Sequence, residues 1–288
     1  MRSLLFVPAD APRKLAKALG SQADVLLVDL EDSVALAAKA GAREDARAFL
    51  AQARAQSTGK RLFVRVNALD TGLTDADLDC VMQARPDGIM LPKSTAGRDI
   101  QHLDAKLAVR EAENGIDQGA TAIIAIATET AGALFNLGTY AGASRRLAGL
   151  TWGAEDLSAE LGSLATRDAA GRYTSPYRLA RDLTLAGARA AEVAPIDTVY
   201  ANFKDAAGFL RECEEAARDG FTGKMAIHPD QVDVINAVFT PSVQAVARAR
   251  AIVAAFAATP DAGVLSIDGE MLDRPHLKRA QRLLARVG

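Results

Sequence analysis

Two carboxylates in the middle of the chain each follow a short apolar segment. Residues 122–126 read A-I-I-A-I and precede Glu129. Residues 147–152 read L-A-G-L-T-W and precede Asp156. Such segments are typical of strands buried on both faces, where a carboxylate is costly and therefore belongs at the strand end. Two such ends suggest oxygen ligands for a hard divalent cation, although Asp and Glu in these positions also cap helices.

Other charged residues also lie at the ends of apolar segments. They are Asp29, Glu31 and Asp32 around the end of 25–30, Arg65 near the end of 62–66, Lys93 after 88–91, and His228 after 223–227. Three acids within four residues repel one another unless a cation or a base lies near them. A buried arginine needs an anionic partner, and for Arg65 this can be Asp29, Glu31 or the carboxylate of a substrate. For His228, which precedes a proline, a hydrogen-bonded structural role is favoured over general-base catalysis.

About eight apolar segments alternate with helix-like patterns, without an internal repeat. This alternation indicates a parallel sheet with helical crossovers, and eight units in about 230 residues match a closed (β/α)8 TIM barrel. The carboxyl ends of barrel strands meet on one face, where active sites are found, which favours the metal interpretation. We expect residues 1–240 to form the catalytic barrel. Residues 241–288 are expected to form a C-terminal helical extension that folds over the barrel mouth or reaches a neighbouring subunit.

Several local features are also predicted. Asp10 is expected to cap a helix over residues 11–19, and residues 197–201 are expected to form a strand. Residues 157–173 are expected to form a long irregular loop resembling an active-site lid. Residues 259–275 are rich in turn signals and are expected to have no strand partner in the barrel.

The composition is that of an ordinary globular protein. Of 288 residues, 49% are hydrophobic and 24% charged, and the net charge of −2 favours neither nucleic acid nor an anionic membrane as a partner. No segment approaches the ~18 apolar residues of a membrane helix, and the apolar run at residues 4–7 is too short for a signal peptide. Cys80 and Cys213 lie outside any CxxC motif and are expected to be buried or half-buried free thiols in a cytoplasmic protein.

Motifs spread along the chain resemble one family. They are R-S-L-L-F-V-P at 2–8, V-D-L-E-D-S-V at 28–34, V-R-V-N at 64–67, L-P-K-S at 91–94, A-T-E-T at 127–130, W-G-A-E-D-L at 152–157, A-I-H-P-D-Q-V at 226–232, and D-G-E-M-L-D-R-P-H-L-K-R-A at 268–280. In this order they resemble the citrate lyase β-subunit-like branch of the HpcH/HpaI aldolase family, which includes malyl-CoA and citramalyl-CoA lyases. The resemblance spans nearly the whole chain and is therefore specific to the family.

The resemblance implies a Mg2+-dependent barrel that acts on a CoA thioester and a small oxo acid. Glu129 and Asp156 match the two carboxylates that bind the metal directly. Glu31 and Asp32 match acids that hold metal-bound waters. Arg65 matches the arginine that holds the oxygen atoms of the substrate.

The resemblance also assigns other residues to substrate binding. The backbone of Gly153, Ala154 and Glu155 looks like the family's cradle for the small carboxylate, and Arg13, Lys14 and Lys93 are weaker candidates for contacts with CoA phosphates. Asp273 matches an aspartate that a neighbouring subunit supplies, so a homo-oligomer is expected, with a trimer as the family expectation. Asp268 is a position where the chain departs from relatives.

The expected reaction is the cleavage of a 3-hydroxyacyl-CoA to an acyl-CoA and a 2-oxo acid. Mg2+ suits this reaction as a Lewis acid and template, with Arg65 neutralising charge on the oxo acid. Asp273 is the candidate that exchanges a proton with the carbon next to the thioester. Three other interpretations remain open: a metal-dependent aldolase for free 2-oxo acids, a citrate lyase β subunit acting on a carrier-linked citryl thioester, and a CoA-ester-binding protein without turnover.

Overall fold

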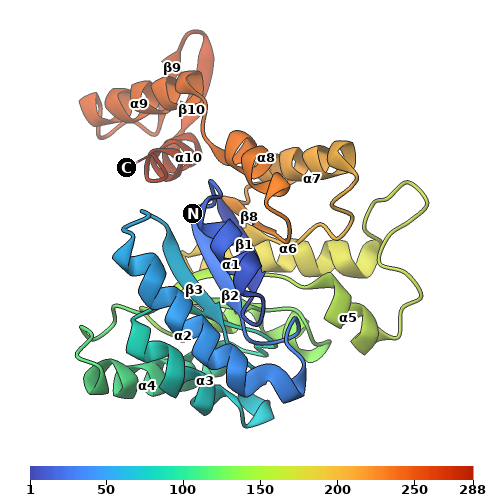
Figure 1. Ribbon diagram of the computed structural model, residues 1–288. Helices are drawn as coiled ribbons and strands as arrows, with labels where there is room; N and C mark the ends of the chain where they lie inside the picture. The colour runs from blue at the N-terminus through green and yellow to red at the C-terminus, as the bar shows by residue number, and fades with distance from the viewer. Residues whose placement is uncertain (288) are drawn as a thin grey trace. The chain divides into compact units, whose positions relative to one another are not determined.

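The computed structural model describes residues 1–287, and eight parallel strands in it form a closed barrel in sequence order (Figure 1). The strands are β1 Ser3–Pro8, β2 Val25–Asp29, β3 Arg61–Arg65, β4 Gly88–Leu91, β5 Ala122–Ile126, β6 Leu147–Thr151, β7 Ala194–Asp197 and β8 Gly223–Ala226. The last strand pairs with the first, with Leu4 opposite Met225. The predicted (β/α)8 barrel is confirmed.

Helices follow the strands and cover the outside of the barrel. The α-helices of this unit are α1 Pro12–Leu19, α2 Lys39–Ala55, α3 Thr74–Val81, α4 Gly97–Glu113, α5 Ala154–Leu161, α6 Ser175–Ala190, α7 Ala206–Asp219 and α8 Asp230–Phe239. After β5 the connection is the 3₁₀ helix η4, Gly132–Tyr140, and shorter 3₁₀ turns span Leu36–Ala38, Leu69–Thr71 and Met82–Ala84. Among the described residues, no helix has the length and apolarity needed to cross a membrane.

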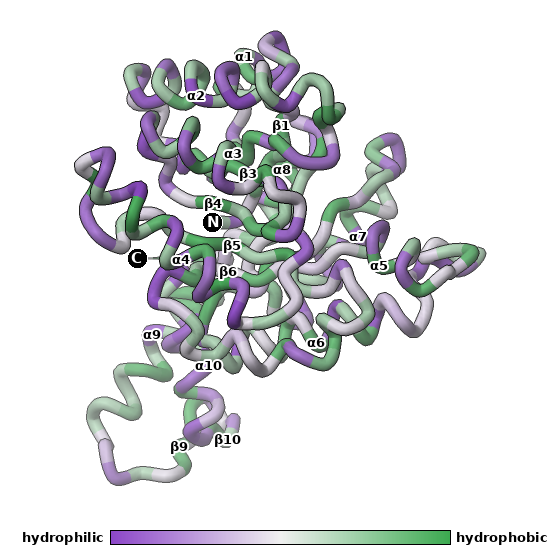
Figure 2. The backbone as a smooth tube through the Cα atoms, turned by 90° about the horizontal axis from the view of Figure 1, so that it is seen from below, coloured by the Kyte–Doolittle hydropathy of each residue, from purple (hydrophilic) through white to green (hydrophobic). Residues whose placement is uncertain are grey.

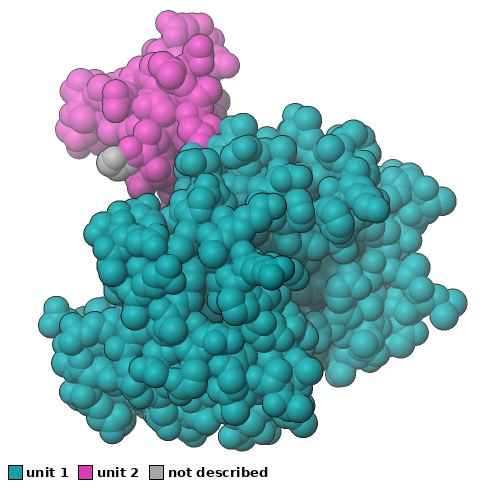
Figure 3. Space-filling view, in the orientation of Figure 1, with its two compact units in different colours: residues 1–239 teal, residues 240–288 magenta. Residues whose placement is uncertain are grey.

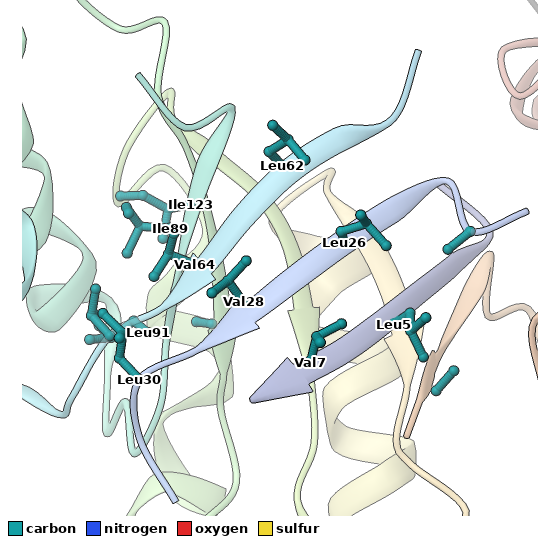
Figure 4. Packing of buried hydrophobic residues seen from close by; sticks show 14 of the residues in the cluster. Leu5, Val7, Leu26, Val28, Leu30, Leu62, Val64, Ile89, Leu91 and Ile123 are labelled. Carbon is teal, nitrogen blue, oxygen red and sulfur yellow. The ribbon is translucent and has the colours of Figure 1, made fainter. Parts of the chain in front are cut away.

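The strands are hydrophobic on both faces, which is why they read as continuous apolar runs. On β2, all five residues are buried. Val25 and Leu27 belong to the cluster inside the barrel, whereas Leu26 and Val28 pack between the strands and the helices (Figure 4). Figure 2 shows hydrophobic colour along the strands and mixed colour along the surrounding helices. Successive side chains alternate between the two cores, as the two-residue period of a strand requires.

The chain divides into two compact units, residues 1–239 and residues 240–288 (Figure 3). The second unit contains α9 Val243–Ala258, the hairpin of β9 Val264–Ile267 and β10 Glu270–Asp273, and α10 Arg274–Leu284. Its own core includes Ile252, Phe256 and Leu272.

The hairpin lies in the segment that was expected to be rich in turns, and it adds two strands to the predicted helical extension. Asp268 and Gly269 form its two-residue loop, with φ of 52° and 82°. Positive φ at both loop residues is the geometry that an Asp-Gly turn favours between antiparallel strands. The Asp-Gly pair between V-L-S-I and E-M-L-D was therefore the signal that the sequence interpretation missed.

Three local predictions were also wrong. Residue 11 precedes α1 without a side-chain cap, so Asp10 does not cap this helix. The strand predicted at residues 197–201 is β7, which spans Ala194–Asp197 and therefore begins earlier than predicted. The carbonyl of Pro195 accepts a hydrogen bond from the Thr222 N–H at 2.9 Å, so the proline takes part in the sheet. The first part of the predicted loop 157–173 belongs to α5, so the irregular segment starts only at Gly162.

Candidate functional site

The carboxyl ends of β2 to β6 bring the predicted charged residues together. Glu31 and Asp32 follow β2, Arg65 ends β3, Lys93 follows β4, Glu129 follows β5, and Asp156 lies in the first turn of α5 after β6. A cavity of about 440 Å³ opens at this end of the barrel. Its lining includes residues that the sequence interpretation did not assign, among them Phe6, Pro8, Thr198, Val199 and Met225. These residues are uncharged, so only their positions at or near strand ends could have pointed to them.

Glu129 is a buried carboxylate that faces the cavity. Its side chain belongs to a residue only 4% exposed, and the backbone N–H of Lys93 donates to its Oε2 at 2.5 Å. Burial, with the negative charge of Asp156 adding to it, raises the pKa of Glu129 to about 8. A buried carboxylate with so few donors needs a cation for its ionised form.

Gly153 makes room for Glu129. A Cβ atom at position 153 would lie 2.9 Å from Cγ of Glu129, closer than real Cβ contacts allow. Its φ of −122° suits any residue, so the glycine is needed for space and not for backbone freedom. The backbone of Gly153, Ala154 and Glu155 enters α5 at the cavity wall. The N–H of Gly153 donates to Oγ1 of Thr128 at 3.3 Å, so the N–H groups suited to bind an anion are those of the helix itself, from Ala154 onward.

Arg65 is bound mainly by an acid of the protein. Its Nε and Nη2 each lie 2.7 Å from the carboxylate of Asp29, which leaves Nη1 at 2.9 Å from Oε2 of Glu31 and 3.4 Å from Asp32. Burial opposes the ionisation of Asp29, but the hydrogen bonds from Arg65 outweigh it and hold the pKa of Asp29 below its usual range. Among the possible partners, Asp29 therefore takes two of the three guanidinium nitrogens, and a substrate would have to share Nη1 with Glu31 and Asp32.

Lys93 lies among carboxylates. Its ammonium pairs with Glu31 and lies 3.4 Å from Asp32 and 3.3 Å from Asp156. This position differs from the expected contact with CoA phosphates. The difference arises because four acids at three strand ends converge on the end of β4, where a single ammonium can reach three of them.

Trp152 lines the cavity, and a buried carboxylate holds its indole ring in place. Its indole N–H donates to Oδ1 of Asp197 at 2.8 Å, and Asp197 pairs with the fully buried Lys224 at 2.5 Å. The ring of Tyr173 packs edge-on against Trp152 at 4.9 Å between centroids. Asp197 and Lys224 were not predicted as residues that support the site, because nothing in the sequence distinguishes a buried ion pair from an exposed one.

Three other candidates on the barrel do not line the cavity. Arg13 and Lys14 are exposed on α1. His228 stacks on Phe203, with 5.1 Å between ring centroids, and its Nδ1 accepts from the N–H of Asp230 at 3.3 Å. These contacts fit the predicted structural role of His228.

Two further candidates belong to the second unit. Asp273 caps α10, and its carboxylate lies 2.5 Å from Nδ1 of His276. This hydrogen bond holds the pKa of Asp273 below its usual range. Asp268, at the tip of the hairpin, pairs with Arg248 at 2.7 Å.

The donor set suits a hard cation that keeps water ligands. Within residues 1–287, no group of three or more His, Cys, Asp and Glu side chains is placed to hold a metal ion. Mg2+ typically uses one or two carboxylates and retains several waters, whereas a structural zinc site needs four protein ligands. Glu129 and Asp156 at the cavity therefore fit Mg2+, with Glu129 as the buried carboxylate that a cation would stabilise.

Comparisons with known proteins agree with this architecture. The chain is 34% identical over 290 residues to the citrate lyase subunit beta of Leuconostoc mesenteroides subsp. cremoris, covering 98% of this chain and 92% of that protein. It is 36% identical to the (3S)-malyl-CoA thioesterase of Cereibacter sphaeroides, covering 99% and 94%. The crystal structure of CitE from Mycobacterium tuberculosis in complex with magnesium, acetoacetate and coenzyme A is similar with a TM-score of 0.76 and 31% identity, covering 100% and 98%.

A family model supports the same assignment. The model of HpcH/HpaI aldolase/citrate lyase matches residues 2–229, which include every strand of the barrel and each charged residue described at its carboxyl end. With the full-length relatives and the barrel geometry, this match shows that the chain belongs to the HpcH/HpaI aldolase/citrate lyase family.

Proposed function

We propose that the protein is a Mg2+-dependent carbon–carbon lyase that cleaves a 3-hydroxyacyl-CoA thioester of the malyl, citramalyl or citryl type into an acyl-CoA and a 2-oxo acid. The observation that carries this proposal is the pair Glu129 and Asp156 at a cavity of about 440 Å³ beside the amino end of α5. A relative with the same fold is described in complex with magnesium, acetoacetate and coenzyme A, which supports both the metal and the substrate class.

Some residues of the cavity bind the metal in this proposal, and others bind the substrate. Glu129 and Asp156 hold Mg2+, which supplies Lewis-acid and orienting chemistry when bound. The free N–H groups at the start of α5 bind the carboxylate of the oxo-acid part. Nη1 of Arg65 faces the same cavity and stabilises negative charge there. Trp152, held by Asp197, keeps water from one side of the site.

The proton balance of the cleavage requires one acid and one base. The substrate hydroxyl loses its proton to a water molecule, which acts as the base, as the carbonyl of the oxo acid forms. The electron pair of the breaking C–C bond goes to the carbon next to the thioester, which then takes up a proton. We assign that proton to Asp273 of a neighbouring subunit in a homo-oligomer, for which a trimer is the family expectation. Within its own unit Asp273 is half exposed and hydrogen-bonded to His276, so it must change surroundings to carry a proton.

Two relatives favour alternative reactions on the same class of substrate. Identity of 36% to a malyl-CoA thioesterase favours hydrolysis of the thioester, which would release free CoA. Identity of 34% to a citrate lyase β subunit favours a carrier-linked citryl thioester. Aldol cleavage of free 2-oxo acids and binding without turnover remain as outcomes of the test.

The decisive experiment incubates the protein with malyl-CoA, citramalyl-CoA and citryl-CoA, each with Mg2+ and with EDTA. Acyl-CoA, free CoA and the 2-oxo acid are measured separately. Mg2+-dependent release of acyl-CoA and oxo acid in equal amounts supports the lyase. Free CoA without an oxo acid supports a thioesterase. No turnover of any thioester by a folded sample overturns the proposal.

The metal ligands provide a first prediction. Glu129→Gln and Asp156→Asn are expected to lower kcat/KM by at least about hundredfold, because a catalytic metal contributes several kcal/mol to the barrier. Their unfolding temperatures in EDTA should stay near that of the wild type, since neither substitution removes packing. Glu214→Gln, at an exposed position on α7, serves as a control and should leave activity unchanged. Wild-type rates in both ligand variants would remove these residues from the metal site.

A further inference from the structure

Lys93 has a backbone conformation that is unusual for a residue with a side chain. It follows β4 and Pro92, and its φ is 51°. The left-handed region is unfavourable for residues other than glycine, and such strain persists where the surrounding structure requires it. The contacts of Lys93 show why the surrounding structure keeps this residue in the left-handed region.

The left-handed turn lets one residue contact both proposed metal ligands. The backbone N–H of Lys93 donates to Oε2 of Glu129 at 2.5 Å. The ammonium at the end of the same residue lies 3.3 Å from Oδ1 of Asp156. It also pairs with Glu31, whose side chain is only 7% exposed. Lys93 therefore links acids that follow three different strands.

The charge balance of the site shows what the ammonium does. Asp29 is already neutralised by two nitrogens of Arg65. The remaining acids at this end of the barrel are Glu31, Asp32, Glu129 and Asp156. Glu31, Asp32 and Asp156 share the ammonium of Lys93 and the last nitrogen of Arg65, whereas Glu129 accepts from the backbone N–H of Lys93. Burying acids with so little compensation is costly. Without Mg2+, Lys93 is thus a principal cation of the cluster.

We propose that Lys93 is a built-in counter-cation that keeps the acids assembled before Mg2+ binds and that Mg2+ then displaces from Asp156. This inference rests on the proposed Mg2+ site. On binding, the ammonium shifts toward Glu31 and Asp32, which it already contacts. Lys93 is a positioning residue of the metal-free protein and a competitor of the metal.

The proposal predicts the direction of a change in metal affinity. Removing a positive charge near the metal should tighten Mg2+ binding by about tenfold, which is the repulsion expected between a divalent and a monovalent cation about 6 Å apart at the dielectric constant of water, about 80. Removing a residue that only orients Glu31 and Asp156 would weaken Mg2+ binding instead. The sign of the change therefore separates the two roles.

The test measures Mg2+ binding by isothermal titration calorimetry for the wild type, Lys93→Met and Lys93→Gly. Lys93→Met keeps much of the side-chain length without charge. Lys93→Gly keeps the N–H that binds Glu129 and relieves the strain of a positive φ, which Lys93→Met retains. An effect shared by both variants therefore cannot come from backbone strain. Lys106→Met is the matched control, because it removes a lysine that pairs with Asp75 on the outside of the barrel at 2.8 Å.

We expect both Lys93 variants to bind Mg2+ about tenfold more tightly than the wild type and Lys106→Met to bind it equally. In EDTA, both Lys93 variants should unfold at a lower temperature than the wild type, and saturating Mg2+ should remove most of that difference. Unchanged or weaker Mg2+ binding in both variants would overturn the role of Lys93. Absence of Mg2+ binding by the wild type would instead overturn the proposed function.

Discussion

At the scale of single residues, the site depends on how closely Glu129 approaches the turn before α5. The carboxylate reaches the cavity by passing next to Gly153, where even one methyl group would meet Cγ at 2.9 Å. Protein interiors are packed too tightly for a conflict of this kind to disappear without movement. The side chain of Glu129 is the part that can move, because the backbone of residue 153 enters a helix.

This contact gives a prediction for Gly153→Ala. The new methyl group should push Glu129 away from the metal position and weaken Mg2+ binding by about tenfold or more, while the unfolding temperature in EDTA changes little. Calorimetric titration with Mg2+ and thermal unfolding measure the two effects. Gly41→Ala is the control, because position 41 lies in α2 with nothing within 4 Å of the added atom. Wild-type Mg2+ affinity in Gly153→Ala would show that Glu129 is not held by this contact.

At the scale of elements, the end of the barrel opposite the site is held by one buried acid. Glu111, near the end of α4, accepts hydrogen bonds from both Nη atoms of Arg146, at 2.5 and 2.6 Å. It also accepts from the backbone N–H groups of Gly119 and Thr121. Arg146 and Thr121 directly precede β6 and β5, so Glu111 ties α4 to the starts of two strands.

We therefore predict that Glu111→Gln lowers the free energy of unfolding at pH 7 by about 1 to 3 kcal/mol, because it removes the carboxylate that accepts from both Nη atoms of the buried Arg146 and leaves only Asp104, which pairs with Nε, as its charged partner. Chemical denaturation measures this loss. Glu113→Gln, an exposed position on the same helix, should cost far less. If the two variants were equally stable, Glu111 would not tie α4 to the strands.

The same acid predicts a pH dependence. Burial opposes the ionisation of Glu111, but the hydrogen bonds from Arg146 prevail and lower its pKa from 4.5 to about 2. A lowered pKa in the folded state contributes stability above the unfolded value and loses it as pH falls through the folded value. The difference in unfolding free energy between wild type and Glu111→Gln should therefore be largest above pH 4.5 and shrink toward pH 2. A constant difference over this range would contradict the assignment.

At the scale of the whole molecule, the proposed chemistry is divided between two compact units. The proposed metal ligands lie in residues 1–239, and Asp273 lies in the unit from residue 240 onward. The second unit has its own core, in which α9 and α10 pack with the hairpin. An acid on such a unit can serve the barrel of a neighbouring subunit, and a ring of subunits would give every barrel one such acid.

A mixing experiment tests whether Asp273 acts on a neighbour. Glu129→Gln and Asp273→Asn should each be nearly inactive alone. When the two are co-expressed with different tags and purified as mixed trimers, we expect about a third of the wild-type activity, because a ring of three that contains both variants pairs an intact barrel with an intact neighbouring Asp273 at one of its three sites. Mixed assemblies without activity would show that the two residues must come from the same chain.

The sequence by itself determined the barrel and the end of the barrel that carries the site. Apolar strands buried on both faces have a pattern that can be read locally, and a carboxylate such as Glu129 or Asp156 must lie where the strand ends. The buried free cysteines Cys80 and Cys213 were predicted correctly for the same reason, since their helical patterns place them facing the core. The Asp-Gly hairpin at residue 268 was equally local and could have been predicted.

Only the tertiary structure decided which charged groups are partners. Arg65 had both Asp29 and a substrate as possible anions, and strand register decided for Asp29, which lies opposite it on β2. Lys93 reaches Asp156 because its φ is positive and because β4 to β6 are neighbours in the barrel. Distances between side chains on different strands depend on register, closure and backbone conformation together. No local pattern of residues contains that information, because each of these charges has several acceptable partners until the barrel closes.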